Sequence, residues 1–185
     1  MNKLVKKILV GAMAATMMLG SVTTAFAAGS PTGAKEPVKQ EAATSTSGAT
    51  VNTNTKGQAT VTSVKKTNST EVRIGSVSVD GTKYAVTRIE SKTFANAAKA
   101  EKVVLPNTLK SIGAEAFTGA KSLETIVIKS KTTVKVNKDA FKNVKTEKMT
   151  IKVTQNMSLT QYKAFKKQLK AAGFKGTIKR VTVGK

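Results

Sequence analysis

One short sequence motif occurs three times between residues 86 and 153, and this repeat constrains the fold more than any other feature. Its markers, 23 and 24 residues apart, are Phe94, Phe117 and Phe141. A short alternating apolar run follows each of them, and the members of these runs that are 23 residues apart are Leu105, Ile128 and Ile151. A fixed period in the twenties, with one strand per period, is typical of a solenoid of stacked coils.

The repeat also predicts which side chains form the core. The inward positions, which stacking would bring into one continuous core, are Val86, Ile89, Phe94, Val103, Leu105, Leu109, Ile112, Phe117, Leu123, Ile126, Ile128, Val134, Val136, Phe141, Val144, Met149 and Ile151. Each apolar run would add one strand to a parallel sheet, because residues two apart in a strand face the same side.

These residues resemble the bacterial surface antigen A type (BspA-like) of leucine-rich repeat. The unit that matches best, residues 109–128, carries the expected residues Ile112, Gly113, Ala116, Phe117, Leu123, Ile126 and Ile128. The first unit departs from the pattern at Glu90 and Ala100, and the third at Asn137. The resemblance implies an α/β fold: a short leucine-rich-repeat solenoid with parallel strands, an N-terminal β cap and a C-terminal helix-strand cap. It also implies a secreted bacterial binding protein.

The N-terminus reads as a secretory signal peptide, residues 1–27. Three lysines precede an apolar stretch, and Ala25-Phe26-Ala27 supplies small residues for cleavage. A membrane anchor is the competing interpretation, but the apolar stretch is interrupted by Gly11, Thr16 and Gly20 and is shorter than the roughly 20 residues that span a bilayer. We therefore expect cleavage before Ala28, and no membrane association afterwards.

Composition divides the rest of the chain in two. Residues 28–57 are rich in Ala, Thr, Ser and Gly, so we expect a disordered tether that buries too little apolar surface to fold. Residues 58–185 would form the repeat domain. The repeats would occupy about 86–153 and a C-terminal cap 154–185.

Two kinds of cap are expected. Alternating strands at 59–64 and 71–79 would cover the first repeat, whose apolar edge is otherwise open. At the other end, Ser158 and Gln161 have the spacing of a capping box, so they mark the start of a helix. Gly173 marks its end, and a strand from Thr177 to Val183 follows.

The residues available for chemistry are few. The sequence has no His and no Cys, which removes Ser-His-Asp and Cys-His arrangements, the usual zinc sites and disulfides. The remote alternative is a hydrolase using two carboxylates, such as Glu115 and Asp139, but these are more simply exposed residues that precede buried phenylalanines. The sequence predicts no enzyme, no cofactor and no metal site.

Lysine is the one functional signal. The chain carries 32 basic and 10 acidic residues, a net charge of +22. Without residues 1–27, which hold three lysines and no acid, the net charge is +19. The candidate ligand-facing surface, which alternates with the core positions of each strand, is Lys102, Val104, Thr125, Val127, Lys129, Lys148, Thr150 and Lys152. A second lysine set on the predicted helix is Lys163, Lys166, Lys167 and Lys170.

Several partners fit this surface. The resemblance implies an extracellular protein or glycan. The positive charge favours anionic cell-wall polymers as the alternative, because it exceeds what solubility requires. Part of this charge would serve only to keep the faces soluble and the sheet edges apart. Specific nucleic-acid binding is not expected, since every aromatic residue is assigned to packing and none is left to stack on bases.

Overall fold

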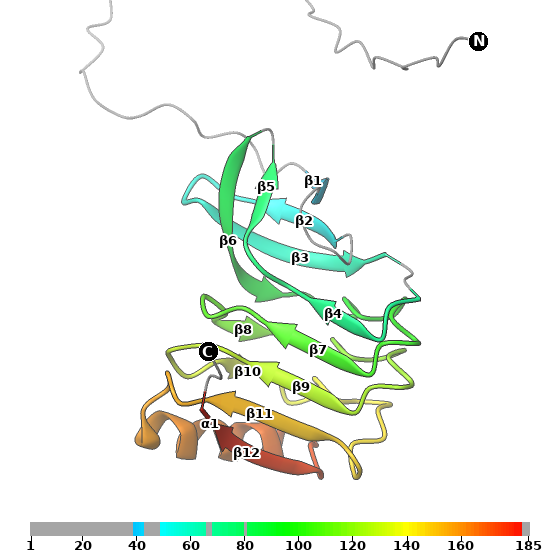
Figure 1. The fold of residues 1–185 in the computed structure, drawn as a ribbon, viewed down its shortest axis with the longest axis vertical. Helices are drawn as coiled ribbons and strands as arrows, with labels where there is room; N and C mark the ends of the chain where they lie inside the picture. The colour runs from blue at the N-terminus through cyan, green and yellow to red at the C-terminus, as the bar shows by residue number, and fades with distance from the viewer. Residues whose placement is uncertain (1–38, 43–48, 66–67, 80, 183–185) are drawn as a thin grey trace, which may run out of the picture. The chain divides into compact units, whose positions relative to one another are not determined.

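Successive coils of the chain build two sheets (Figure 1). The structure is a computed structural model, and it describes residues 39–42, 49–65, 68–79 and 81–182. The signal peptide expected at residues 1–27 lies outside the described residues. In each central coil, a strand of one sheet leads through the turn that carries the repeat phenylalanine to a strand of the other sheet.

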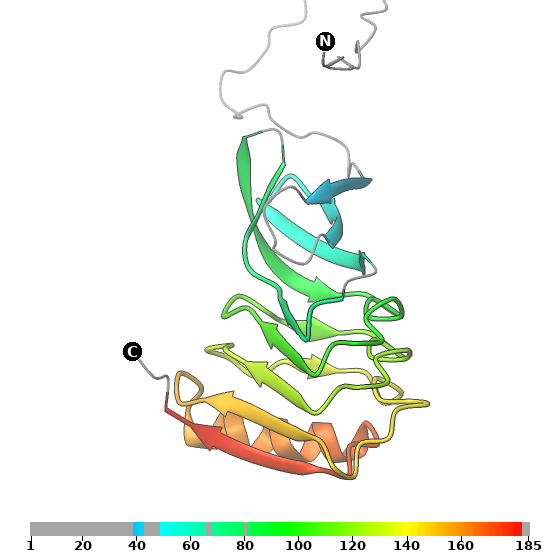
Figure 2. The same cartoon turned by 45° about the vertical axis from the view of Figure 1, so that its right-hand side comes forward.

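The first sheet has five strands, and every neighbouring pair is parallel. In spatial order they are β4 (Glu71–Arg73), β7 (Lys102–Leu105), β9 (Thr125–Ile128), β11 (Thr150–Thr154) and β12 (Thr177–Val181). Val103, Ile126 and Ile151 are register partners on its inner side, and all three are fully buried. This confirms the alternation expected from the sequence. Figure 2 shows the strands stacked one below another.

The second sheet has seven strands. Its path is β1 (Lys39–Ala42), β2 (Ala49–Thr53), β3 (Gln58–Val64), β6 (Thr82–Ile89), β8 (Ser111–Ile112) and β10 (Lys135–Val136), with β5 (Val77–Val79) paired to β6. The pairs β3–β6, β6–β8 and β8–β10 are parallel, whereas β1–β2, β2–β3 and β5–β6 are antiparallel. The N-terminal segment thus adds one parallel coil to the repeats, because β3 pairs with β6 and β4 pairs with β7. Beyond this coil, β1 and β2 extend the sheet from β3 as antiparallel strands.

The boundary expected between tether and domain is wrong. β1 and β2 lie within the segment 28–57, and Ala49 and Val51 of β2 are fully buried. β2 hydrogen-bonds along β3 in an antiparallel register. The average composition of the segment conceals this strand, because a few small apolar residues suffice when the strand adds to a sheet that already exists.

The segment predicted as one alternating strand at 71–79 is two strands in two sheets. β4 ends at Arg73, and the N–H of Ile74 donates to the carbonyl of Val104 at 2.8 Å. Gly75 and Ser76 then carry the chain away to β5, which pairs with β6. The chain therefore leaves the first sheet beside β7, and this departure shapes the pocket described below.

The phenylalanines of the repeat form a column of rings in the core. Phe94 and Phe117 stack with centroids 5.2 Å apart, as do Phe117 and Phe141. Phe174 continues the column, 5.2 Å from Phe141 with a tilted ring. Most of the predicted inward positions are buried, while Val136 and Val144 are partly buried against the core.

The C-terminal cap follows the sequence prediction closely. Helix α1 (Leu159–Ala171) begins with a capping box, in which the Gln161 N–H donates to Ser158 Oγ and the Ser158 N–H donates to Gln161 Oε1, both at 3.2 Å. At its end, Gly173 has a φ of 88°, and the Phe174 N–H donates to the Leu169 carbonyl at 3.1 Å. This hydrogen-bond pattern is the expected Schellman motif. β12 then closes the five-stranded sheet.

Candidate binding face

The outward residues of the five-stranded sheet line up in two rows across the strands, and we call this surface the outer strand face. Parallel pairing in register places equivalent residues of successive coils side by side. The first row contains Glu71, Lys102, Thr125, Thr150 and Thr177, and the second contains Arg73, Val104, Val127, Lys152 and Lys179.

Six of the eight predicted surface residues belong to these rows, so the structure does bring them together. The other two do not sit on strands. Lys129 follows the end of β9 and Lys148 precedes the start of β11, which places them at opposite ends of the strands. Lys129 and Lys148 therefore lie beyond the two rows, one at each end of the strands.

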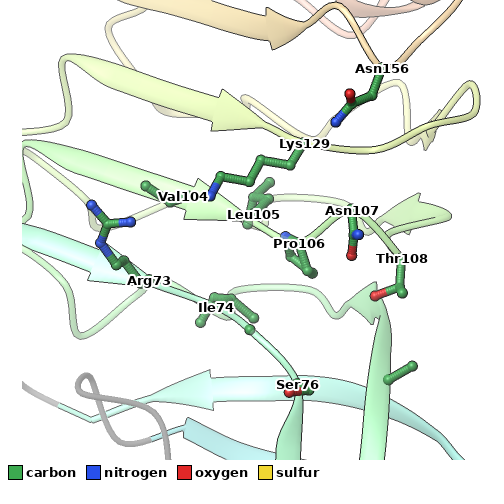
Figure 3. Close-up of a pocket in the computed structure, with 12 residues that line it drawn as sticks. Arg73, Ile74, Ser76, Val104, Leu105, Pro106, Asn107, Thr108, Lys129 and Asn156 are labelled. Carbon is green, nitrogen blue, oxygen red and sulfur yellow. The ribbon is translucent and has the colours of Figure 1, made fainter. Parts of the chain in front are cut away.

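Val104 is less accessible than expected for a residue of the predicted ligand-facing surface. Its side chain points to the outer side of β7, but the residue is only 5% exposed. Arg73 is its register partner on β4, and Lys129 extends toward it in Figure 3. Alternation along a strand decides the side on which a residue lies, whereas the length of its neighbours' side chains decides its exposure. Val127, in the same row, is half-buried and remains available for contact.

Sequence reasoning missed the residues that extend both rows, above all Arg73 and Lys179. Both segments were recognised as cap strands, but no local signal gives the register of a cap against the repeat. Glu71, also missed, pairs with Arg73 and accepts a 3.1 Å hydrogen bond from Lys102 Nζ. These contacts offset the positive charge at the β4 side of the outer strand face.

Positive charge is concentrated at the β12 side of the same face. Lys152 and Lys179 are exposed register partners on β11 and β12. No carboxylate among residues 49–65, 68–79 and 81–182 forms an ion pair with either of them. Their ammonium groups are therefore free to meet an anionic ligand.

The surroundings of Lys148 are mixed in charge. Glu124, Lys145 and Glu147 line one hollow of about 310 Å³ with it. The pKa of the Glu147 carboxyl is lowered, first by a hydrogen bond to its own backbone and then by the nearby Lys175 and Lys145. The Glu147 side chain therefore stays negatively charged to lower pH than an ordinary glutamate. These negative charges make Lys148 a weaker anion contact than Lys152.

The lysines of the helix form a separate basic surface. Lys163, Lys166, Lys167 and Lys170 are all exposed, while Phe165 and Leu169 face the core. α1 lies beside β10 of the other sheet, where the Val136 N–H donates to Gln168 Oε1 at 3.2 Å. The structure therefore separates the helix lysines from the outer strand face.

A pocket of about 450 Å³ opens at the carboxyl ends of β4, β7, β9 and β11 (Figure 3). We call it the strand-end pocket, and its lining residues are Arg73, Ile74, Gly75, Ser76, Ala85, Val104, Leu105, Pro106, Asn107, Thr108, Lys129 and Asn156. Of the predicted surface residues it includes Val104 and Lys129. It therefore joins the end of the outer strand face to the departing segment 74–76.

Of the two carboxylates considered for catalysis, Glu115 is held in surface ion pairs. Glu115 lies 3.6 Å from Lys92 and 3.6 Å from Lys142. Its N–H donates to the Asp139 carbonyl at 2.8 Å, which links two adjacent coils. Within the described residues, no group of three acidic side chains is arranged to hold a metal ion. The outer strand face and its pocket offer binding groups: ammonium and guanidinium groups, hydroxyls, amides and aliphatic side chains.

Comparisons with known proteins bear on the whole repeat region. The sequence profile described as "BspA type leucine rich repeat region (6 copies)" matches residues 87–183. No match is found among curated proteins. In the part of the chain that the structure describes, no helix is long and apolar enough to cross a membrane.

Two solved structures are similar in fold. One is a leucine-rich cell surface protein from Faecalibacterium prausnitzii A2-165, with 23% sequence identity and a TM-score of 0.45 over 61% of this chain and 32% of that one. The chain thus spans about a third of the length of that protein. The other is a leucine-rich repeat protein from Bacteroides capillosus ATCC 29799, with 20% identity and a TM-score of 0.46 over 74% of this chain and 94% of that one.

Proposed function

Because the chain belongs to the BspA-type leucine-rich repeat family, we propose that it is a secreted, non-catalytic bacterial module that binds an extracellular protein or glycan. Family membership supports the repeat architecture directly. The proposed partner, extracellular location and lack of catalysis rest on the outer strand face, the N-terminal sequence and the residues available for chemistry.

The observation that carries this proposal is the outer strand face. Its two rows cross five parallel strands, so equivalent groups recur at the strand spacing of about 4.8 Å. Hydroxyls of Thr125 and Thr150 lie beside the aliphatic Val127, and Lys152 and Lys179 follow. Such a surface offers hydrogen bonds, apolar contact and positive charge to one extended ligand.

The extracellular location is supported by the N-terminal sequence. A basic start, an apolar stretch and Ala25-Phe26-Ala27 have the order of a secretory signal peptide. The absence of cysteine from the whole sequence means that burial alone must stabilise the exported domain. The stacked core of the repeats is suited to that requirement.

The alternative function is a basic module held on the cell wall by anionic envelope polymers. The net charge of +19 that remains without residues 1–27 and the exposed lysines of α1 favour it. Many weak, screened contacts would then act together, and no single surface would dominate. A hydrolase remains the remote alternative, and the ion pairs of Glu115 with Lys92 and Lys142 argue against a catalytic use of that carboxylate.

A pull-down from extracellular fractions with three variants separates these functions. Val127→Glu and Lys152→Glu change the outer strand face, while Lys166→Glu makes the same charge change as Lys152→Glu on the distant helix surface. A specific ligand of the face should be lost with the first two variants and kept with the third. Equal losses for Lys152→Glu and Lys166→Glu would favour the diffuse polyanion alternative.

Retention on isolated cell walls tests the alternative directly. The Debye length falls from about 10 Å at 0.1 M salt to about 3 Å at 1 M, so polyanion binding should be nearly abolished at 1 M salt. Chemical removal of the anionic wall polymers should abolish it at low salt as well. Retention that survives both treatments would eliminate the polyanion function and leave the protein or glycan ligand.

A further inference from the structure

The strand-end pocket has walls that the main chain holds in place. On one side, the Ile74 N–H donates to the Val104 carbonyl at 2.8 Å. On another, Thr108 Oγ1 donates to the Val86 carbonyl at 2.7 Å, which fixes the loop after β7 against β6. A site whose backbone is already ordered loses little conformational freedom when it binds a ligand.

The third wall is fixed in the same way. Asn156 lies between two anchored residues: the Gln155 N–H donates to the Val181 carbonyl at 2.9 Å, and Arg180 Nη2 donates to the Met157 carbonyl at 2.8 Å. Strands β4, β7, β9 and β11, which belong to four successive coils, therefore bring their carboxyl ends to one hollow.

The floor and rim of this pocket differ in chemistry. Ile74, Val104 and Pro106 give an apolar floor and are themselves buried. The exposed polar residues of the rim, which carry hydroxyl or amide groups, are Ser76, Asn107, Thr108 and Asn156. Hydroxyl and amide groups can both donate and accept hydrogen bonds, so they match a ligand that carries several hydroxyls.

The charge of the pocket is positive. Arg73 and Lys129 line it, and its lining contains no Asp or Glu. Arg73 pairs with Glu71 outside the lining, whereas Lys129 has no ion-pair partner among the described residues 49–65, 68–79 and 81–182. In Figure 3 the Lys129 side chain extends over the sheet toward Val104, so its ammonium group lies above the apolar floor.

We propose that the strand-end pocket binds a hydroxyl-rich anion: a sugar or polyol unit that carries a carboxylate or a phosphate. Lys129 pairs with the anionic group, the rim residues hydrogen-bond the hydroxyls, and Val104 and Pro106 contact the aliphatic face. The pocket volume of about 450 Å³ falls in the range of roughly 300–1,000 Å³ typical of small-ligand sites. This inference rests on the proposed binding function and assigns the ligand class of one site within it.

Two sources of such a unit are distinguished by the probes. An acidic glycan is represented by glucuronate, and a polyol-phosphate polymer by glycerol 3-phosphate, with glucose as the neutral control. Amide chemical shifts of the ¹⁵N-labelled protein are followed during titration. We expect one of the anions to shift the amides of Ser76, Val104, Asn107 and Thr108, and glucose to bind at least tenfold more weakly. The anion that binds more tightly identifies the source.

Lys129→Gln is the decisive variant, with Lys152→Gln as its matched control. Both remove one lysine charge from the same face, but Lys152 does not line the pocket. Lys129→Gln should weaken anion binding about tenfold, which corresponds to about 1.4 kcal/mol. Lys152→Gln should change it less than twofold. Unchanged thermal midpoints for both variants show that neither effect reflects unfolding.

Three results would overturn the proposal. The first is no shift at the pocket amides up to about 50 mM anion, far above a weak dissociation constant of about 1 mM. The second is equal weakening by both lysine variants, which indicates diffuse charge. The third is glucose binding as tight as anion binding. None of these results alters the pull-down with Val127→Glu, so the pocket and the binding function of the outer strand face can fail separately.

Discussion

The rings of Phe94 and Phe117 stack in parallel, with centroids 5.2 Å apart and only 2° between their planes. The two residues are 23 positions apart in sequence and occupy the same place in adjacent coils. Phe117 stacks in the same way on Phe141, with an angle of 6°. Each repeat therefore contributes one ring to a shared column, and no single coil could bury its ring alone.

Phe117→Ala tests this column. Phe117 is fully buried with a ring on each side, so the substitution should lower the free energy of unfolding by about 3–5 kcal/mol. Phe174→Ala should cost about 0.5–1.5 kcal/mol less, because Phe174 has one ring neighbour, which it meets at 55°. Urea denaturation of the two variants measures the difference. Equal, small shifts of the midpoint would contradict a column of mutually supporting rings.

Val51→Asp tests whether the N-terminal strands belong to the domain. Val51 is fully buried in β2, and an unpaired carboxylate placed there should cost several kcal/mol. The control is Thr55→Asp, at an exposed position of the following turn, which should change stability by less than about 0.5 kcal/mol. Thermal unfolding of both proteins checks this. If Val51→Asp left the midpoint unchanged, residues 49–53 would be a tether after all.

Gly119→Ala tests how closely the coils approach at the turns. Gly119 has a φ of 93°, and a Cβ there would lie 2.5 Å from the Ala95 carbonyl oxygen of the preceding coil. The backbone strain alone should cost about 1–3 kcal/mol, and the close approach adds to it. Gly173→Ala is the matched control, because Gly173 has a similar φ of 88° but its Cβ would meet nothing within 4 Å. Chemical denaturation that ranked the two variants equally would show that the turns can separate without cost.

Thr93→Val tests the polar contact between the N-terminal coil and the first repeat. The buried Thr93 hydroxyl has one hydrogen to share between two acceptors, the Val61 carbonyl at 3.0 Å and the Glu90 carbonyl at 2.8 Å. Valine keeps the shape but removes the donor, so the loss should be about 1 kcal/mol. Thr118→Val removes an exposed contact of 2.8 Å to Lys142 and should cost less, because water can replace the hydroxyl. A thermal shift for Thr118→Val as large as that for Thr93→Val would contradict this role of burial.

The candidate surface could be predicted only in part. Alternation along each repeat strand correctly placed Thr125, Val127, Thr150 and Lys152 on the outer side of the sheet. It could not show that long neighbouring side chains cover Val104, which is 5% exposed. Exposure depends on residues from other coils, and these are not neighbours in sequence.

The sequence by itself determined the features that arise within one coil or one helix. The period of the phenylalanines determined the solenoid, and the apolar alternation of each run determined which residues face the core. Ser158, Gln161 and Gly173 determined the ends of α1, because their effects on the backbone act over a few residues. These local patterns are short-range and can be recognised without knowing their tertiary neighbours.

Only the tertiary structure decided what lies beside each coil. It placed β2 in the core, extended the outer rows to Arg73 and Lys179, and assembled the strand-end pocket from four strand ends. Each of these features depends on the register between strands that are 20 or more residues apart or that lack the repeat pattern. Register of this kind is selected by the burial of side chains from both strands together, so no single stretch of the sequence contains it.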